Sequence, residues 1–311
     1  MEIIVGTYEE LLLAYNLVDS DKGFTLQQSF TNHNHTGCIK CLNVSKNDIL
    51  VSGSTDETIQ LINLKSRKET GSLMEHSGTV TSLNSFDDYL ISSSEDGSIC
   101  IWDVKSWQCL KTLKKHKSAV FDVAIHPSGK LAISCGKDNT LRTWDLTNGK
   151  CAFVINTTAA SLKWNETGKH YIAITGNKID TYEMETGKKT TTELSYPICS
   201  SLFISETELL VGGEGGHLEI IDLISGEKRL SIDSQMKRVK CLTCSLVQEG
   251  PNNPWIIAGS SDGMIKIFRL DKEGSTWSSS LVAKHDTKFR LTCIAIRETG
   301  PVSCESDDST E

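Results

Sequence analysis

Residues 92–103, SSSEDGSICIWD, and residues 134–145, SCGKDNTLRTWD, decide the fold of this chain. Each stretch runs from small residues through a turn with an Asp into a segment of alternating apolar and polar residues that ends in Trp-Asp. Such alternation is typical of a half-buried β-strand, and Asp followed by Gly or Asn is typical of a tight turn. The sequence therefore predicts the same strand–turn–strand unit twice, about forty residues apart.

The unit recurs along the whole chain. Four further copies share its pattern: 52–63 and 258–269, with the same spacing after the turn Asp, and the weaker 172–183 and 211–222, with Gly at the turn. A β-prone apolar segment precedes each copy, and one more such segment, 290–296, has no unit after it. Its partner is at the other end of the chain, since 5–16 aligns with 52–63.

Such a repeat must close on itself. A ring of four-stranded sheets has to join its first and last members, because otherwise two sheet edges stay unpaired. The segment 290–296 would complete the sheet that residues 3–30 begin. The sequence therefore predicts an all-β chain with a single domain, 1–300, that forms a β-propeller of seven blades, closed by pairing the N-terminal strands with the C-terminal strand. Six or eight blades remain open as counts. The acidic residues 301–311 predict a disordered tail.

The composition restricts where the chain works and what it binds. A formal net charge of −8 gives nucleic acid no overall attraction, so any RNA contact must be local. Acidic Glu2, Glu9 and Glu10 stand where a signal peptide needs basic residues, and no stretch approaches the roughly 20 apolar residues that span a bilayer. The odd number of cysteines, 11, in apolar segments is typical of reduced thiols. We therefore expect an intracellular chain without membrane contact.

Trp102-Asp103 and Trp144-Asp145, with a His upstream of each unit, carry a resemblance to the WD40 family. In that family a His, a Ser on the second strand, the turn Asp and the Trp form a buried hydrogen-bonded network within a blade. The resemblance implies two full networks and a shorter one, in which Ile62 replaces the Trp. Their residues are His76, Ser92, Asp96 and Trp102; His116, Ser134, Asp138 and Trp144; and His35, Ser52 and Asp56.

The same residue types could also belong to an enzyme. Ser, His and Asp can form a hydrolase triad, but the trio recurs in several blades, although an active site is needed once, and no G-x-S-x-G motif is present. The Gly-rich segment 211–217 lacks the ending of a phosphate-binding loop. We therefore expect no catalytic residue, no enzymatic activity and no cofactor.

A zinc site is another alternative. His33, His35, Cys38 and Cys41 form the pattern HxHxxCxxC, with ligand types that zinc prefers. If a strand begins at Cys38, the two cysteines are three positions apart and face opposite sides of the sheet. His35 also belongs to an implied network. We therefore expect no metal site.

Partners of a propeller usually bind its loops. By resemblance, WD40 domains often use the face that carries the turn Asp residues. This predicts contacts at Lys137, just before a turn Asp, and at Lys40, Phe121 and Lys240, near the starts of inner strands. An exposed aromatic ring is a typical hot spot, although Phe121 could instead pack between blades.

Two basic runs stand out in the acidic sequence, namely 105–117 and 237–240. Either run could contact phosphate or an acidic partner. A solvated face of an outer strand explains the first run equally simply.

The sequence resembles one WD-repeat family more closely. The stretches 56–62, 76–83, 90–111, 126–146 and 260–268 are similar to the PAK-interacting proteins. This resemblance implies a nuclear and nucleolar scaffold in ribosome biogenesis, in maturation of the large subunit, and a negative regulator of PAK, a protein kinase activated by small GTPases. It implies a PAK-type kinase, ribosome-assembly factors and, indirectly or locally, pre-rRNA as partners of a monomer within larger complexes. Family members typically continue into a lysine-rich tail, whereas this sequence ends at Glu311.

A generic signalling or ubiquitin-ligase adaptor is the alternative function. Propellers that dock on the cullin machinery often carry a WDxR motif. Lys105 and Thr147 occupy the Arg position in this chain. The motif is therefore absent from both Trp-Asp units.

Overall fold

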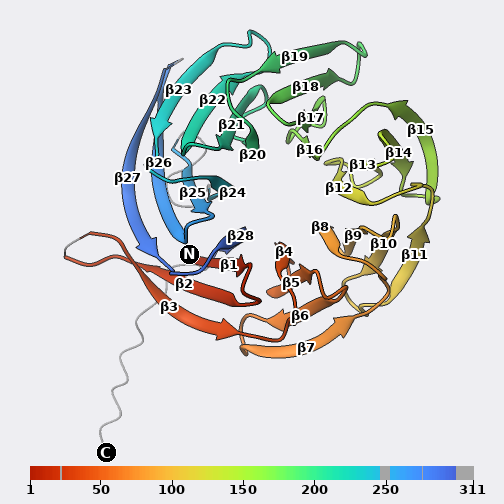
Figure 1. Cartoon of the computed structure of the whole chain (residues 1–311), viewed down its shortest axis with the longest axis horizontal. Helices are drawn as coiled ribbons and strands as arrows, with labels where there is room; N and C mark the ends of the chain where they lie inside the picture. The colour runs from red at the N-terminus through yellow and green to blue at the C-terminus, as the bar shows by residue number, and fades with distance from the viewer. Residues whose placement is uncertain (22, 246–252, 275, 299–311) are drawn as a thin grey trace, which may run out of the picture.

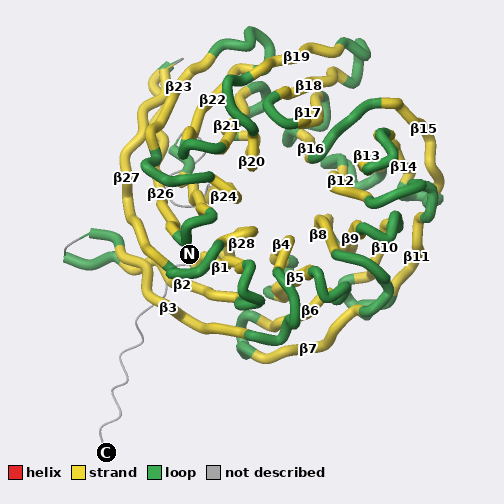
Figure 2. Tube along the Cα trace, in the orientation of Figure 1, coloured by secondary structure: helices red, strands yellow, loops and turns green. Residues whose placement is uncertain are grey.

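A computed structural model describes residues 1–21, 23–245, 253–274 and 276–298. These residues form seven antiparallel sheets of four strands each, arranged as blades around a central axis (Figure 1). Strands, turns and loops make up all of this part of the chain, and none of its segments is a helix that could cross a membrane (Figure 2). The prediction of a seven-bladed all-β propeller is confirmed. The tail predicted at 301–311 and the last two residues of the predicted domain lie outside the described residues.

In blades 1 to 6 the chain enters at the centre and leaves at the rim (Figure 1). The innermost strands of blades 1 to 7 are β4 (Ile39–Val44), β8 (Val80–Phe86), β12 (Val120–Ile125), β16 (Ser161–Trp164), β20 (Ile198–Phe203), β24 (Val239–Ser245) and β28 (Leu291–Arg297). The second strands are β5 (Ile49–Ser54), β9 (Tyr89–Ser94), β13 (Leu131–Gly136), β17 (His170–Thr175), β21 (Glu208–Gly213), β25 (Trp255–Ser260) and β1 (Glu2–Thr7). The third strands are β6 (Ile59–Asn63), β10 (Ile99–Asp103), β14 (Thr140–Asp145), β18 (Lys178–Glu183), β22 (His217–Asp222), β26 (Met264–Glu273) and β2 (Leu12–Val18). The outer strands are β7 (Lys68–Leu73), β11 (Cys109–Leu113), β15 (Lys150–Asn156), β19 (Lys189–Glu193), β23 (Lys228–Asp233), β27 (Thr276–Asp286) and β3 (Thr25–Asn32).

The hydrophobic core lies between neighbouring blades. One cluster joins Ile4 and Leu12 of blade 7 to Ile39 and Leu50 of blade 1. Second strands such as β1, β21 and β25 are buried at every position, whereas most of β15 at the rim is exposed. Each sheet buries its apolar faces against its two neighbours, so no blade can form its core alone.

Blade 7 is built from both ends of the chain, as predicted. Strand β28 pairs antiparallel with β1, and the register runs from Glu2 opposite Arg297 to Thr7 opposite Leu291. Glu2 is fully buried and pairs with Arg67 of blade 1 at 2.8 Å and with Arg297 at 3.6 Å. The closure therefore carries buried ion pairs as well as backbone hydrogen bonds.

Replacing Ile4 by Ala tests the importance of this closure. Ile4 is fully buried between blades 7 and 1. The cavity left behind should lower the free energy of unfolding by about 2–5 kcal/mol, measured by denaturant titration. Ile224→Ala is the matched control because Ile224 is 72% exposed. Equal losses in the two variants would contradict the role given to the closure.

Candidate partner-binding site at the channel mouth

A chain of four side chains crosses blade 3. The indole nitrogen Nε1 of Trp144 donates to the Ser134 hydroxyl at 2.8 Å, and this hydroxyl lies 2.8 Å from Nε2 of His116. Nδ1 of His116 lies 3.1 Å from the Asp138 carboxylate. Because the ionised Asp138 can only accept, Nδ1 carries a proton; burial lowers the pKa of His116 and favours the neutral ring, whose Nε2 then accepts from the Ser134 hydroxyl while that hydroxyl accepts from the indole. The imidazole is neutral in this arrangement.

Blades 1 and 2 repeat the arrangement. In blade 2, Trp102 donates to Ser92 at 2.8 Å, Ser92 lies 2.7 Å from His76, and His76 lies 3.3 Å from Asp96. Blade 1 keeps the contacts of His35 with Ser52 and Asp56, both at 2.8 Å, without a Trp. The structure thus brings together, within each blade, the network residues that the resemblance implied.

The turn Asp ties each network to the loop that enters the blade. The backbone amide of Lys117 donates to Asp138 at 2.9 Å, and the Thr140 hydroxyl donates to it at 2.7 Å. Thr58 and Ser98 make the same hydroxyl contact with the turn Asp of blades 1 and 2. These hydroxyls were not among the predicted network residues. The pattern Asp-x-Ser/Thr could have identified them, because it is present in all three turns and is typical of Asp-capped turns. The networks therefore fix the loops of one face of the propeller.

Burial determines the charge state of the networks. It lowers the pKa of His76 and His116, and the charges of Asp96 and Asp138, which accept hydrogen bonds from the two rings, oppose this shift only in part. Burial alone would raise the pKa of Asp138, but hydrogen bonds from the Lys117 amide, Thr140 and His116 lower it to about 2. Ser92 and Ser134 are fully buried, so neither hydroxyl can reach a substrate. These trios are structural in the geometry observed.

A β-bulge near the start of the inner strand recurs in six of the seven blades. At each one the register with the neighbouring strand skips one residue. In blade 4, Ala160 takes the corresponding place without a skip. A bulge turns its extra side chain away from the ladder. The seven residues, which we call the channel mouth, are Lys40, Thr81, Phe121, Ala160, Cys199, Lys240 and Thr292, and all of them line one cavity of about 630 Å³.

Only some of these side chains are available to a partner. The hydroxyl of Thr81 donates to the carbonyl of Val120 at 2.9 Å, and that of Thr292 donates to the carbonyl of Ile39 at 2.5 Å, so both bridge neighbouring blades. Lys40, Lys240 and Phe121 are exposed instead. Phe121 is 39% exposed, so part of its side chain is open to a partner. Three of the four predicted contacts therefore gather at the channel mouth.

Lys137, the fourth predicted contact, does not line this cavity. It lies in the turn after β13, where its backbone amide donates to the carbonyl of Ala119 at 2.8 Å. Its side chain is exposed outside the ring that the bulges form. Lys137 therefore lies on the same face of the propeller as the channel mouth but does not line the mouth.

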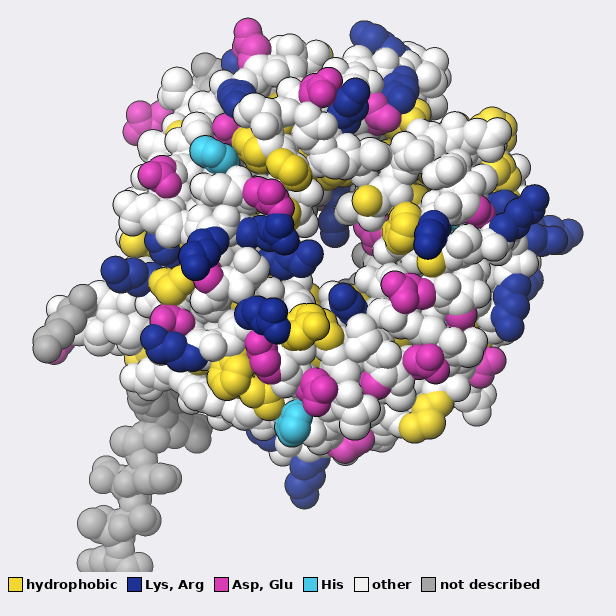
Figure 3. All heavy atoms as spheres, in the orientation of Figure 1, with side chains coloured by type: hydrophobic (Ala, Val, Ile, Leu, Met, Phe, Trp, Pro, Cys, Tyr) yellow, Lys and Arg dark blue, Asp and Glu magenta, His cyan; other side chains and the backbone are white. Residues whose placement is uncertain are grey.

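Positive charge gathers on one side of the channel mouth. Burial raises the pKa of the Cys38 thiol; the charges of Lys40, Lys240 and Arg290 oppose this shift, and the carboxylate of Glu9 adds to it. Arg290 is paired with Glu9 at 3.0 Å, whereas Lys40 and Lys240 have no ion-pair partner within the part of the chain that the structure describes. Figure 3 shows Lys and Arg side chains over β24 and β4 beside the central hollow. This side of the mouth suits an acidic group.

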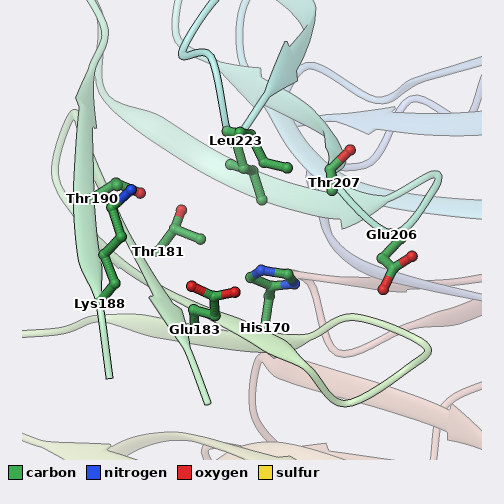
Figure 4. A pocket seen from close by; sticks show the side chains of 9 residues that line it. His170, Thr181, Glu183, Lys188, Thr190, Glu206, Thr207 and Leu223 are labelled. Carbon is green, nitrogen blue, oxygen red and sulfur yellow. The ribbon is translucent and has the colours of Figure 1, made fainter. Parts of the chain in front are cut away.

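A second cavity, of about 260 Å³, lies between blades 4 and 5. Figure 4 shows His170, Thr181 and Lys188 of blade 4 facing Leu223 of blade 5 across it. Its carboxylates are already engaged, because Glu183 accepts from Thr186 at 2.6 Å and Glu206 is paired with Lys169 at 3.3 Å. It therefore offers a charged partner less than the channel mouth does.

Cys38 and Cys41 of the HxHxxCxxC segment do not lie on one regular strand, as the prediction from side-chain alternation required. Cys38 precedes β4, and the bulge at Lys40 interrupts the alternation before Cys41. His33 lies near Glu10 at 3.5 Å, while His35 belongs to the blade 1 network. Within the described ranges, no group of three His, Cys, Asp or Glu side chains is placed to hold a metal ion.

The WD domain, G-beta repeat family matches residues 24–63, 67–103, 107–145 and 234–269. The chain is similar to p21-activated protein kinase-interacting protein 1-like of Gallus gallus, with 36% identity over 95% of this chain and 80% of the relative. It is 38% identical to p21-activated protein kinase-interacting protein 1 of Homo sapiens, over 95% of this chain and 77% of the relative. Shk1 kinase-binding protein 15 of Schizosaccharomyces pombe is 27% identical over 94% of this chain and 83% of the relative.

The neutral histidines predict how stability depends on pH. Because the pKa of His116 is lower in the folded chain than its ordinary value of 6.5, acidification below that value protonates the unfolded chain first and removes stability. The melting temperature should fall from about pH 7 to about pH 5, with a further loss as Asp138 is protonated between its ordinary 3.8 and about 2. His116→Gln should make the first slope shallower, and an unchanged slope would contradict the neutral tautomer.

Proposed function

The chain belongs to the WD-repeat family of p21-activated protein kinase-interacting proteins, and on this basis we propose that it is a non-catalytic scaffold that binds such a kinase and lowers its signalling. The names of two relatives support the kinase as a partner, since one is a p21-activated kinase-interacting protein and another a Shk1 kinase-binding protein. The channel mouth is the surface that we assign to this contact.

One observation carries the proposal: Lys40 and Lys240, for which the described residues provide no ion-pair partner, share the channel mouth with the exposed ring of Phe121. Charged groups at an interface steer association and fix orientation, while an exposed aromatic ring supplies apolar contact. Such a mouth fits a kinase segment in which carboxylates lie near an apolar side chain. The networks of blades 1 to 3 hold the surrounding loops in place before the partner arrives.

A second role is participation in ribosome biogenesis, in maturation of the large subunit, with a nuclear and nucleolar location. Its support is the family resemblance of the sequence. The same lysines, Lys40 and Lys240, would supply a local contact with pre-rRNA phosphate if the chain touches RNA directly, because the net charge of −8 offers no general attraction. Ribosome-assembly factors are the other partners of this role.

Reversing both free charges at the channel mouth tests the kinase contact. The double variant Lys40→Glu with Lys240→Glu should bind a purified p21-activated kinase at least about tenfold more weakly in a calorimetric titration, because it places carboxylates against an acidic segment. Lys130→Glu with Lys150→Glu is the matched control. It changes the net charge equally, at exposed lysines beside β13 and β15 on the opposite face. Equal affinity of the two double variants would contradict the assignment.

Sedimentation of a nuclear extract tests the ribosomal role. The chain should travel with pre-large-subunit particles on a sucrose gradient and stay with them after a high-salt wash, since protein contacts resist screening better than phosphate contacts do. Restriction to the light fractions, with kinase binding intact, would contradict this role and leave the kinase proposal standing.

A further inference from the structure

An apolar groove of about 450 Å³ lies between blades 2 and 3 at the end of the propeller opposite the channel mouth. Blade 2 contributes residues of the strands β9, β10 and β11. Blade 3 contributes two turns, one that precedes β13 and one that follows β14. The lining residues that the argument uses are Tyr89, Ile101, Leu110, Lys111 and Leu146.

This groove occupies the same place in the fold as the cavity between blades 4 and 5. Tyr89 pairs with Asp103 as His170 pairs with Glu183, so Tyr89 and His170 correspond. Ile101 opposite Ile91 corresponds in the same way to Thr181 opposite Ile172. The fold therefore leaves an opening at both positions. The cavity between blades 4 and 5 combines Leu223 and Ile224 with seven polar or charged residues, whereas apolar side chains make up most of the lining between blades 2 and 3.

Large apolar side chains are exposed at this groove. Leu110 is 55% exposed and Tyr89 is 49% exposed, and both belong to its wall. The stem of Lys111 lies against Gly149, where a Cβ atom would come within 2.5 Å of it, and its amine donates to the carbonyl of Asn148 at 2.8 Å. A carbonyl leaves the charge of the amine uncompensated. The groove thus combines apolar walls with a positive group at its edge.

The basic run that the sequence analysis singled out continues from this edge. Lys111, Lys114, Lys115 and Lys117 are exposed, and the described residues offer none of them an ion-pair partner. Figure 3 shows Lys and Arg side chains along the rim over β11. The run was interpreted either as a contact for an acidic partner or as a solvated face of an outer strand. A solvated strand needs no apolar groove beside it, so the groove favours the contact.

We propose that the groove between blades 2 and 3 binds an extended peptide of a partner protein, with a large apolar side chain in the groove and carboxylates along Lys111 to Lys117. An extended chain rises about 3.3 Å per residue, so a carboxylate opposite Lys114 stands about three residues from the apolar side chain opposite Lys111. The apolar walls favour a peptide over the phosphate backbone of RNA. The groove itself is separate from the channel mouth, and the basic run leads from it along β11 to Lys117, whose backbone amide donates to the turn Asp138. The proposal is independent of the kinase proposal.

A selection from a library of random linear peptides, displayed on phage against the whole chain, tests this site. The enriched peptides should combine a large apolar residue with Asp or Glu about three residues away. A synthetic enriched peptide, labelled with fluorescein, should then lose at least about tenfold in affinity for Leu110→Asp in an anisotropy titration. Lys111→Glu should weaken binding and make it less sensitive to salt, because it removes the charge that salt screens.

Leu281→Asp is the matched control. Leu281 lies on the outer strand β27 of blade 6 and is 51% exposed, close to the exposure of Leu110. It should bind the peptide as the unchanged chain does, and so should Lys40→Glu with Lys240→Glu. Three outcomes would overturn the proposal: no enriched motif, binding that survives Leu110→Asp, or a single-stranded RNA probe that binds and is lost with Lys111→Glu but not with Leu110→Asp.

Discussion

The pairing of β1 with β28 joins parts of the chain that are nearly its whole length apart, as the contact of Thr292 with the carbonyl of Gly6 illustrates across 286 positions. Every blade buries its apolar faces against two neighbours, so an open ring would leave two faces and two strand edges in water. Closure is therefore the condition for the core of every blade. It also sets the diameter of the central channel, since the seven inner strands can surround one cavity only when the ring is complete.

The closed ring presents the same bulge in six blades and gives it different side chains. Thr81 and Thr292 use the position to bridge blades, whereas Lys40, Phe121 and Lys240 leave it open to a partner. The networks of blades 1 to 3 lie beneath this surface. Their largely buried side chains hold the turns and the entering loops in place. Structural side chains are thus buried behind the face, and the side chains that we assign to partner binding stand at the bulges on it.

Much of this could be predicted from local patterns. The Asp turn and its fixed spacing predicted the strands and the split blade, since each repeat contains the residues that form it. Lys40, Phe121 and Lys240 could be named because they occupy matching positions at the starts of inner strands. The alternation of side chains along a strand does not reveal a bulge. The bulge at Lys40 shifts the register before Cys41, so alternation could not predict on which side of the sheet Cys41 lies relative to Cys38. The groove could not be predicted from the sequence, because Leu110 and Leu146 in its walls belong to different blades and come together only when the two blades pack.

Carbodiimide cross-linking of the chain to a p21-activated kinase, followed by mass spectrometry, tests the assignment of the channel mouth most directly. This reagent joins a lysine amine to a carboxylate only where the two groups touch. The account predicts links from Lys40 and Lys240 to acidic residues of the kinase. Links confined to lysines on the opposite face, such as Lys130 and Lys150, would contradict it.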